Sequence, residues 1–416
     1  MTATGSFFKS RWVDVPGNVR ETAGGLPRGF RAAGVACGIK PSGNLDLGLI
    51  ASGAAATTSA ARFTRSGTQS APVLLCRERC NLQGIRGIVV NAGNANAATG
   101  RPGFENAAKM QGAAALASGV GIESAMAVAS TGVIGVPLPM DRVMQGLVAA
   151  THVLRPDGEQ DFARAIRTTD VLDKHASLEV ALDGGLVRLT AQAKGAGMIS
   201  PNFATLLCFV QTDAALSPET CDLLLGVTCK RSFERVSVDG QLSTSDTVIL
   251  QASGESGVQV EPETEDEVHF GEALDALLRQ LALYIVRDGE GARRICRVVV
   301  RGGDDSSVAR VAHAVADSPL VKTALYGGDP NWGRIIQAVG MAMPGTAPLE
   351  VDVAIEGVQV CRRGSYAPHD ADALRAAVQG EEIEYEIGLP GEGAEIERYF
   401  SDLGHEYVTL NAEYTT

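Results

Sequence analysis

The sequence predicts a mixed fold of helices and strands, and three observations support this. Apolar runs of strand length alternate with helical stretches along the whole chain, without an internal repeat. Hydrophobic residues make up 45% of the 416 residues and charged residues 20%, which is typical of globular proteins and not of disordered ones. At about 150 residues per domain, the length allows two or three domains. The sequence is therefore that of an α/β or α+β protein.

The first half of the chain repeats the order strand, loop, helix. A buried strand over 87–90 leads into an asparagine-rich loop, and Pro102 then begins an Ala-rich helix. A second strand over 125–129 leads to Ser130-Thr-Gly-Val-Ile-Gly135 and to a helix that begins near Pro139. Both loops should therefore lie at the carboxyl ends of strands.

A hairpin and a glycine-rich loop follow. Residues 178–190 alternate apolar and polar side chains around Asp183-Gly184, which predicts a β-hairpin. The loop Lys194-Gly-Ala-Gly-Met-Ile-Ser-Pro-Asn202 comes next, and the apolar run 206–210 reads as a buried strand. Thr205 therefore stands where a flexible loop meets a strand.

Two helices are predicted in the next segment. Ser217-Pro218 is a typical helix start, and the acidic run 261–267 precedes a long amphipathic helix that ends near Asp288. Carboxylates at the start of that helix suit its positive end, so the acidic run is read as a solvated helix start.

The pattern restarts near residue 300, where we expect a boundary between a domain over 1–300 and a domain over 301–416. The elements predicted around and after this point are a strand over 297–301, a helix that ends at 316, a strand over 323–326 and later short strands.

Charge and cysteine usage exclude several classes of protein. The net charge of −13 and the lack of any Lys/Arg run of five or more residues argue against nucleic-acid binding. No stretch approaches the roughly 18 apolar residues of a membrane span, and we expect a cytoplasmic protein with no membrane partner. Eight scattered cysteines favour reduced thiols. Without a His-x-x-x-His or Cys-x-x-Cys spacing, no metal site is expected.

Thr205 is the candidate nucleophile that the residues themselves offer. If its Oγ attacked the carbonyl of Ala204, the peptide would become an ester, and hydrolysis would leave Thr205 with a free α-amine. That amine would have a pKa of about 7.7–8.0 and would suit a base for its own hydroxyl. Threonine is also common in strands, so the residues alone leave a purely structural role open.

A series of motifs resembles the ornithine acetyltransferase (glutamate N-acetyltransferase) family of self-cleaving amino-terminal-nucleophile enzymes. The segment Lys194-Gly-Ala-Gly-Met-Ile-Ser-Pro-Asn-Phe-Ala-Thr-Leu-Leu207 is similar to the family's self-cleavage segment. The likeness continues over nearly the whole chain, in Gly29-Phe-Arg-Ala-Ala-Gly-Val35, Val90-Asn-Ala-Gly-Asn-Ala-Asn-Ala97, Ser130-Thr-Gly-Val-Ile-Gly135, Asp329-Pro-Asn-Trp-Gly-Arg334 and Asn411-Ala-Glu-Tyr414.

The resemblance implies roles for the catalytic residues. It makes Ala204–Thr205 the cleavage bond, which would yield chains 1–204 and 205–416, and Thr205 the residue that accepts the acyl group. Thr131 and Gly132 match the family's oxyanion hole, where a hydroxyl and a backbone N–H aim at one developing charge. Removing such a donor typically costs about 10²–10³ in rate.

The resemblance also implies the substrates. Besides Thr205, the positions that match substrate contacts are Lys194, Glu290, Asn411 and Thr416. The charges of Lys194 and Glu290 complement the carboxylate and ammonium groups of an amino acid. The implied reaction transfers acetyl from N2-acetylornithine to glutamate through an ester on Thr205, in arginine biosynthesis. No metal or organic cofactor is implied, and acetyl-CoA is left open as a further acetyl donor.

By the same resemblance, the fold is a layered α-β-β-α sandwich of the amino-terminal-nucleophile type. A smaller C-terminal α/β domain follows and contributes substrate contacts. The implied assembly is an α2β2 tetramer of cleaved chains.

The chain departs from the family pattern at two places. Val171 replaces a threonine that contacts substrate, and Gln241 and Leu242 change a second stretch. An unpaired polar substrate group would cost about 1–3 kcal/mol, enough to alter substrate preference. Three alternatives therefore stay open: a homologue in a specialised pathway with another amino-acid substrate, an amidase or aminopeptidase, and an uncleaved amino-acid-binding protein.

Overall fold

The computed structural model describes residues 6–201 and 206–413. Three main sheets carry the fold. The six-stranded sheet contains, in spatial order, β1 (Val19–Glu21), β7 (Lys174–Leu182), β8 (Gly185–Lys194), β9 (Leu207–Thr212), β12 (Thr247–Ala252) and β4 (Thr58–Phe63). The four-stranded sheet contains β2 (Phe30–Val35), β3 (Leu47–Ser52), β5 (Gly87–Asn94) and β6 (Met126–Val133).

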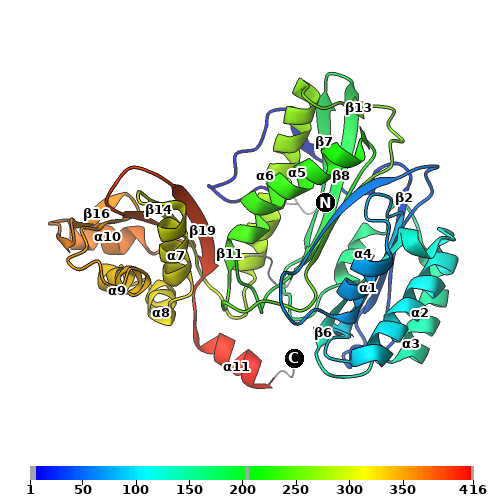
Figure 1. Ribbon diagram of the computed structural model, residues 1–416, viewed down its shortest axis with the longest axis horizontal. Helices are drawn as coiled ribbons and strands as arrows, with labels where there is room; N and C mark the ends of the chain where they lie inside the picture. Colours follow the sequence, from blue (N-terminus) through cyan, green and yellow to red (C-terminus); the bar gives the residue numbers. More distant parts are fainter. Residues whose placement is uncertain (1–5, 202–205, 414–416) are drawn as a thin grey trace.

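The two sheets face each other between layers of helices (Figure 1). Alternate residues of β9 show this, because side chains on a strand point to opposite faces in turn. Cys208 and Val210 belong to the core under the outer helices α5 (Pro218–Arg231) and α6 (Glu265–Arg287). Leu207 and Phe209 belong to the core shared with the four-stranded sheet. The chain therefore forms the predicted α-β-β-α sandwich.

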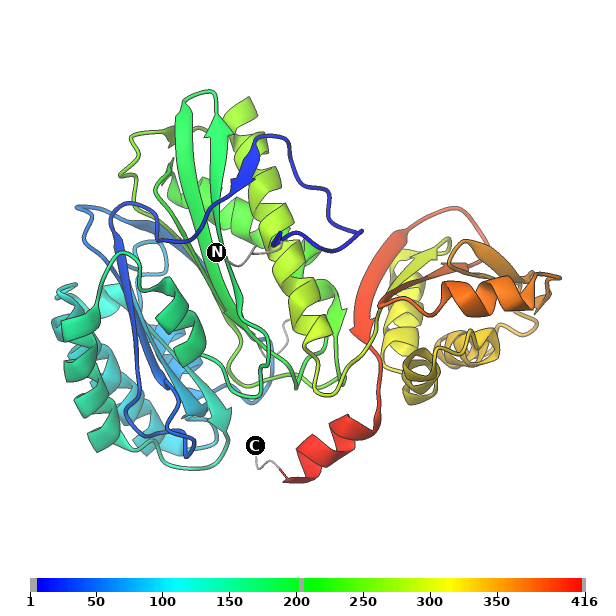
Figure 2. The same ribbon diagram turned by 180° about the vertical axis from the view of Figure 1, so that it is seen from behind.

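Four helices belong to the second half of the sandwich. They are α1 (Ala71–Arg79), α2 (Gly100–Ser118), α3 (Met140–Val153) and α4 (Glu159–Ala165). The first three cover the outer face of the four-stranded sheet, whereas α4 contacts both sheets (Figure 2). Phe162 of α4 stacks edge-on against Phe209 of β9, with 5.6 Å between ring centroids.

Several predicted elements form for the reasons that the sequence gives. The Ser217 Oγ accepts a hydrogen bond of 3.0 Å from the Thr220 amide and caps α5, with Pro218 in the first turn. The hairpin predicted around Asp183-Gly184 is β7–β8. The predicted strands over 87–90 and 125–129 are confirmed as β5 and β6, which are longer than expected.

The smaller C-terminal unit has its own core and a seven-stranded sheet (Figure 1). That sheet contains β11 (Val236–Ser237), β19 (Glu395–Ser401), β14 (Ile295–Arg301), β18 (Glu382–Gly388), β15 (Asp352–Ile355), β16 (Val358–Arg362) and β17 (Ser365–Tyr366). Its helices are α7 (Asp305–Ala316), α8 (Pro319–Gly327), α9 (Trp332–Ala342) and α10 (Ala371–Ala377), and a small parallel pair, β10 (Ala215–Leu216) with β13 (Gln259–Val260), lies in the first unit.

Two expectations for this unit need correction. The segment 323–326 is helical and not a strand, because Ser318 caps α8, Pro319 stands in its first turn and Gly328 ends it in a left-handed conformation. The boundary expected at residue 300 falls inside β14, whose residues belong to the C-terminal core from Cys296 onward. The change from the first unit's core to the C-terminal core falls between Ile295 and Cys296.

The two units are joined at more than one place. The short strand β11, which comes from the first unit's part of the chain, pairs in parallel with β19 of the C-terminal sheet. The last helix, α11 (His405–Glu413), returns from the C-terminal unit toward the edge of the sandwich (Figure 2). The C-terminal unit can therefore contribute residues to a site in the first unit.

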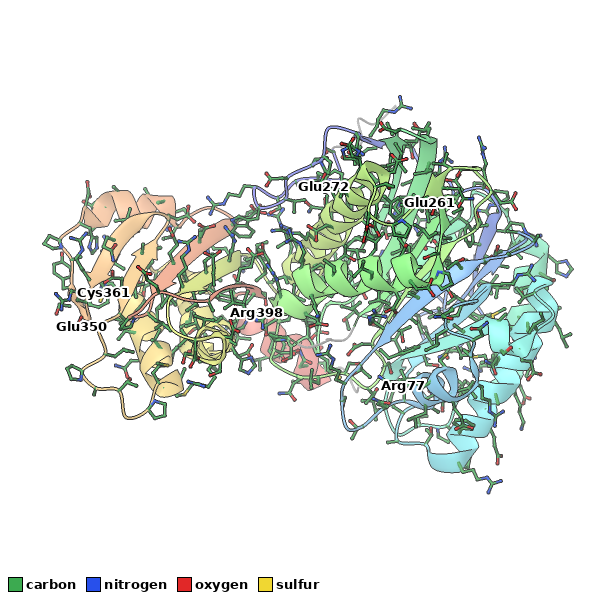
Figure 3. All side chains as sticks on the ribbon, turned by 45° about the horizontal axis from the view of Figure 1, so that its top comes forward. Arg77, Glu261, Glu272, Glu350, Cys361 and Arg398 are labelled. Atoms are coloured by element: carbon green, nitrogen blue, oxygen red, sulfur yellow. The ribbon has the colours of Figure 1, made fainter. Side chains whose placement is uncertain are left out.

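The surface is mainly charged and polar. Glu261 and Glu272 lie exposed beside the α5–α6 layer, and Glu350 lies exposed on the C-terminal unit (Figure 3). Within the part of the chain that the structure describes, no helix is both long and apolar enough to cross a membrane.

Candidate active site

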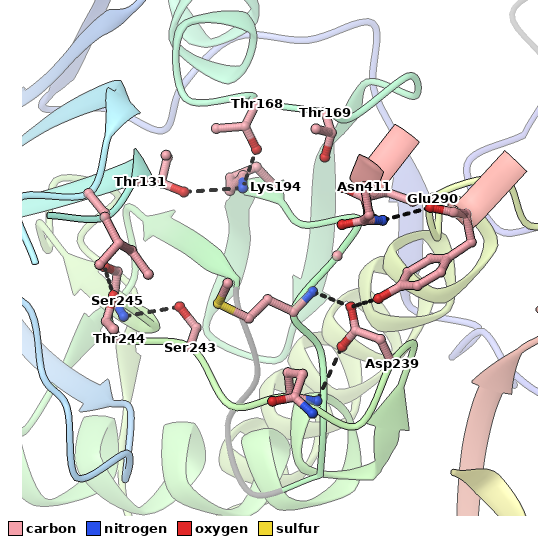
Figure 4. A pocket seen from close by; sticks show the side chains of 17 residues that line it. Thr131, Thr168, Thr169, Lys194, Asp239, Ser243, Thr244, Ser245, Glu290 and Asn411 are labelled. Atoms are coloured by element: carbon pink, nitrogen blue, oxygen red, sulfur yellow. Dashed lines mark hydrogen bonds between the residues drawn. The ribbon is translucent and has the colours of Figure 1, made fainter. Parts of the chain in front are cut away.

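A cavity of about 180 Å³ lies where strand ends of both sheets meet α11. It is lined from the first unit by Thr131, the 168–169 loop, Lys194, the 239–245 loop and Glu290, and from α11 by Tyr407 and Asn411 (Figure 4). Because liquid water occupies about 30 Å³ per molecule, the cavity suits a small molecule and not a polymer. The structure thus brings together Thr131, Gly132, Lys194, Glu290 and Asn411, which the sequence analysis had placed in one site.

Lys194 is the last residue of β8 and is almost completely buried. Its Nζ donates hydrogen bonds to Thr168 Oγ1 at 2.8 Å and to Thr131 Oγ1 at 3.3 Å. Burial lowers the pKa of Lys194, and the nearby Asp170 carboxylate opposes this effect. Because Thr131 accepts from Lys194, its own hydroxyl proton remains free to donate to a ligand.

Lys194 also lies next to a network of buried charged side chains, Asp170, Lys174 and Asp288. The Asp170 carboxylate accepts from Lys174 Nζ at 2.8 Å and from the Gly195 amide at 2.6 Å, and it lies 3.9 Å from Lys194 Nζ. Lys174 also bonds Asp288, which accepts from the Val171 amide. Burial alone would raise the pKa of Asp170, but Lys174 and Lys194 outweigh it and hold that pKa well below the usual range.

Gly132 takes a conformation that another residue could hardly adopt. Its φ is +128°, and a Cβ at this position would lie 2.4 Å from the carbonyl carbon of Gly93. The reason is that β5 and β6 pair up to this point, with Gly93 opposite Gly132. The close approach of the two strands places the Thr131–Gly132 peptide at the wall of the cavity.

Glu290 and Asn411 face each other across the two units. Asn411 Nδ2 of α11 donates to Glu290 Oε2 at 2.7 Å, and the Glu290 amide donates to Ala196 O at 3.1 Å (Figure 4). A Cβ on Gly197 would lie 2.8 Å from the Glu290 carboxyl, so a larger side chain there would displace that carboxyl from its present position. Lys194 and Glu290 therefore give the cavity one cationic and one anionic group.

Asp239 and Tyr407 belong to the cavity but were not predicted. Asp239 accepts from the Met198 and Ile199 amides at 2.6 and 2.9 Å, and Tyr407 Oη donates to it at 3.3 Å (Figure 4). Burial raises the pKa of Asp239. Tyr407 precedes Asn411 by four residues, a helical spacing that places both side chains on one face of the helix. This spacing could have revealed Tyr407 as a site residue from the sequence.

Thr168 and Thr169 line the cavity, whereas Val171 does not belong to its lining as described. Val171 is 78% exposed, so the absence of a threonine hydroxyl at this position gives no ground here for a changed substrate. Gln241 lines the cavity, but Leu242 is not part of the described lining. Of the three departures from the family pattern, only Gln241 stands where it would meet a ligand.

Three of the predicted site residues, Ala204, Thr205 and Thr416, lie outside the described residues. The first described residue after Thr205 is Leu206, which is buried. Its amide donates to Asp246 Oδ1 at 3.0 Å.

Two asparagine side chains of the segment 91–96 form hydrogen bonds with backbone carbonyl groups. Asn91 Nδ2 donates to Asn94 O at 2.8 Å, and Asn96 Nδ2 donates to Gly103 O at 2.9 Å. Over residues 6–201 and 206–413, no group of three or more His, Cys, Asp or Glu side chains is arranged to hold a metal ion.

The fold and the cavity together define a two-unit α/β protein with a small cavity, lined by charged side chains, at the junction of its units. The family model for the ArgJ family matches residues 31–416. The arginine biosynthesis bifunctional protein ArgJ of Nitratidesulfovibrio vulgaris is 42% identical over 93% of this chain and 98% of its own length. That of Symbiobacterium thermophilum is 41% identical, over 95% of this chain and 99% of its own length.

Solved structures of the same family also match. ArgJ of Bacillus halodurans is 32% identical, covers 50% of this chain and 98% of its own and has a TM-score of 0.47. Ornithine acetyltransferase of Mycobacterium tuberculosis, solved with ornithine, is 36% identical, covers 45% and 99%, and has a TM-score of 0.40. From the family model and the relatives, the chain belongs to the ArgJ family, which confirms the resemblance seen in its motifs.

Proposed function

We propose that this protein is the N-acetyltransferase of arginine biosynthesis that moves acetyl from N2-acetylornithine to glutamate. Its ArgJ relatives are named arginine biosynthesis bifunctional proteins, and the ornithine acetyltransferase neighbour was solved with ornithine. These names favour acetyl transfer between amino acids over the amidase and binding-protein alternatives.

The observation that carries the proposal is the pair of opposite charges in one small cavity. Lys194 and Glu290 line the cavity together with Thr131 and Gly132. N2-acetylornithine has a free carboxylate and a side-chain ammonium, which such a pair would hold at its two ends. The acetyl group, which is attached near the carboxylate, would then lie on the Lys194 side, where Thr131 is 3.3 Å from Lys194 Nζ.

The proposed mechanism uses two acyl transfers. The neutral α-amine of Thr205 takes the proton of its own hydroxyl while Oγ attacks the acetyl carbonyl, and the proton then passes to the departing ornithine amine. The Thr131 hydroxyl and the Gly132 N–H stabilise the developing oxyanion. The neutral amine of glutamate then attacks the acetyl ester on Thr205, and a proton passes from this amine through the Thr205 α-amine to Oγ. The ester bond breaks, the hydroxyl is restored, and N-acetylglutamate leaves.

Denaturing electrophoresis and mass spectrometry test this proposal. The purified protein should run as two fragments, 1–204 and 205–416, and the second should gain one acetyl mass with N2-acetylornithine. Thr205→Ala should give one uncleaved band and no transfer. Free acetate in excess of N-acetylglutamate would instead identify a hydrolase, and an uncleaved wild-type chain that binds amino acids would identify a binding protein.

The remaining parts of the proposal concern donor, assembly and place of action. Acetyl-CoA is tested as a second donor by the same acetyl-mass measurement. Two cleaved chains should associate as an α2β2 tetramer, which the mass in solution tests, and a single-chain mass would remove that part. As an enzyme of amino-acid biosynthesis, the protein is placed in the cytoplasm.

A further inference from the structure

Asp246 is a completely buried carboxyl group that the proposed acetyl transfer does not use. It stands directly before β12, and its backbone oxygen accepts from the Thr64 amide at 3.0 Å. Its Oδ1 accepts from the Leu206 amide at 3.0 Å, whereas Oδ2 has no hydrogen-bond partner among the described residues. A buried polar atom without a partner costs about 1–3 kcal/mol, so such an atom calls for a reason.

The strand register places Asp246 beside Leu206, the first described residue after the expected cleavage bond. Leu207 of β9 is paired with Lys194 of β8 on one side and with Thr247 of β12 on the other. Lys194 and Asp246 therefore flank the start of β9 from the two neighbouring strands. Leu206, which Asp246 holds by its amide, is covalently bonded to Thr205.

The surroundings of Asp246 make it a group that can exchange a proton near neutral pH. Burial raises the pKa of Asp246 to about 7, although the hydrogen bond from the Leu206 amide and the charge of Lys194 act to lower it. The charged group that acts on Asp246 is thus Lys194. Its ammonium donates to Thr131 and Thr168, so in its charged form it has no lone pair with which to accept a proton.

Self-cleavage needs a base that the uncleaved chain does not yet have at Thr205. Before cleavage the Thr205 nitrogen is an amide, and it becomes a basic amine only when the bond to Ala204 is broken. The base of the later acetyl transfer is therefore not available for the first step. A general base is most effective when its pKa lies near the working pH.

We infer that Asp246 is the base of self-cleavage, an inference that rests on the proposed function of Thr205. The Thr205 hydroxyl gives its proton to the Asp246 carboxylate while Oγ bonds to the Ala204 carbonyl carbon. The carbon–nitrogen bond then breaks, and Asp246 returns the proton to the departing nitrogen. Water hydrolyses the resulting ester, which leaves a carboxylate on Ala204 and restores the hydroxyl. The Asp246 carboxylate is unchanged at the end.

The test follows cleavage of the full chain after cell-free synthesis. The labelled chain is diluted into buffers from pH 5.5 to 8.5, and denaturing electrophoresis measures the fraction cleaved with time. The wild-type rate should rise about tenfold per pH unit below pH 7 and level off above it, because the carboxylate is the active form. Asp246→Asn should slow cleavage by about 10²–10⁴ and remove this pH dependence.

Asp213→Asn is the matched control, since Asp213 is a buried aspartate that directly follows β9 at its far end. It accepts from the Arg188 amide at 2.7 Å and should cleave like the wild type. If Asp246→Asn cleaves at the wild-type rate with the wild-type pH profile, the inference is overturned while the proposed function stands. If the wild type itself never yields a fragment that begins at Thr205, both fail.

A second measurement decides the matter if Asp246→Asn does not fold, as judged by the loss of a cooperative thermal transition. The wild-type profile alone is then informative, and a flat rate between pH 6 and 8 overturns the inference. Lys194→Met removes a charge that lowers the pKa of Asp246, so a slope that persists in this variant and moves to higher pH supports Asp246. Loss of that slope assigns the proton transfer to Lys194 instead.

Discussion

Lys174 and Asp170 form an ion pair that has no exposed side-chain surface, with Nζ 2.8 Å from Oδ1. Lys174 also bonds Asp288, so one cation stands between two carboxylates. Each carboxylate holds backbone amides of the site, Gly195 for Asp170 and Leu172 for Asp288. The predicted substrate residue Lys194 thus shares Asp170 with a second lysine that does not line the cavity as described.

The first prediction is that Lys174→Met destabilises the protein by about 3–5 kcal/mol, because it leaves two buried carboxylates without their cation. In this variant Asp170 should attract Lys194 away from Thr131 and Thr168. The substitution should therefore raise KM for the amino acid more than it lowers kcat. Urea unfolding at fixed protein concentration and steady-state kinetics measure the two effects.

The control is Arg101→Met, which removes an exposed ion pair of 3.0 Å with Glu105. Exposed pairs contribute about 0–1 kcal/mol, so this variant should unfold close to the wild type. Equal stabilities for Lys174→Met and the wild type would contradict the role given to the buried pair.

The second prediction compares two glycines of the Ser130–Gly135 loop. Gly132→Ala should lower kcat by about 10²–10³, because its Cβ would meet the Gly93 carbonyl carbon at 2.4 Å and displace the N–H of the proposed oxyanion hole. Gly135 also has a positive φ, +81°, but a Cβ there meets no atom within 4 Å. Gly135→Ala should therefore cost only about 1–2 kcal/mol of stability and leave kcat near wild type. Similar kcat values for the two variants would speak against the oxyanion role.

Much of the fold could be predicted, because its elements carry local signals. Ser217-Pro218 marks the start of α5, and Asp183-Gly184 marks the turn of the β7–β8 hairpin. The prediction of a strand over 323–326 was wrong for an equally local reason. Four apolar or β-branched residues fit a short strand, and the capping residues Ser318 and Gly328 outside the segment decide for a helix.

Residues of the site could be predicted only where they belong to motifs shared with the family. Lys194, Glu290 and Asn411 come from the family resemblance, and the structure brings them into one cavity. Asp239 and Asp246 were missed because their roles depend on amides more than 39 residues away in the chain, those of Met198 and Leu206. Such pairings depend on the tertiary structure, which no local pattern of the sequence shows.

The third prediction concerns the attachment of α11 to the cavity. Tyr407→Phe removes the hydroxyl that donates to Asp239 at 3.3 Å. A hydrogen bond of this kind contributes about 0.5–1.5 kcal/mol, so KM should rise about 2–10-fold with little change in kcat. Val408→Ala is the control, because Val408 lies on the same helix and is 66% exposed. If both variants keep the wild-type KM, the hydroxyl does not hold the helix in place for binding.

The last prediction uses the pKa values of two buried aspartates, Asp246 and Asp170, which are shifted in opposite directions. It is made in a Thr205→Ala background, so that all chains stay uncleaved. Burial raises the pKa of Asp246 from 3.8 to about 7, so between these pH values the folded chain keeps a proton that the unfolded chain loses. Stability then falls as the pH rises from 4 to 7, by about 1.4 kcal/mol per unit.

Asp246→Asn cannot ionise and escapes this loss, while its amide oxygen still accepts from Leu206. Its free energy of unfolding relative to the parent should therefore increase by a few kcal/mol between pH 4.5 and 7.5 and stay level above that. Asp170→Asn should show the reverse trend. The lowered pKa of Asp170 adds stability that is present at neutral pH and is lost as the pH falls below about 4. Urea unfolding at pH 3, 4.5, 6 and 7.5 measures both. Relative to the parent, Asp246→Asn should change between pH 4.5 and 7.5 and Asp170→Asn between pH 3 and 4.5, and parallel pH profiles for the two variants would refute the assignment of opposite pKa shifts.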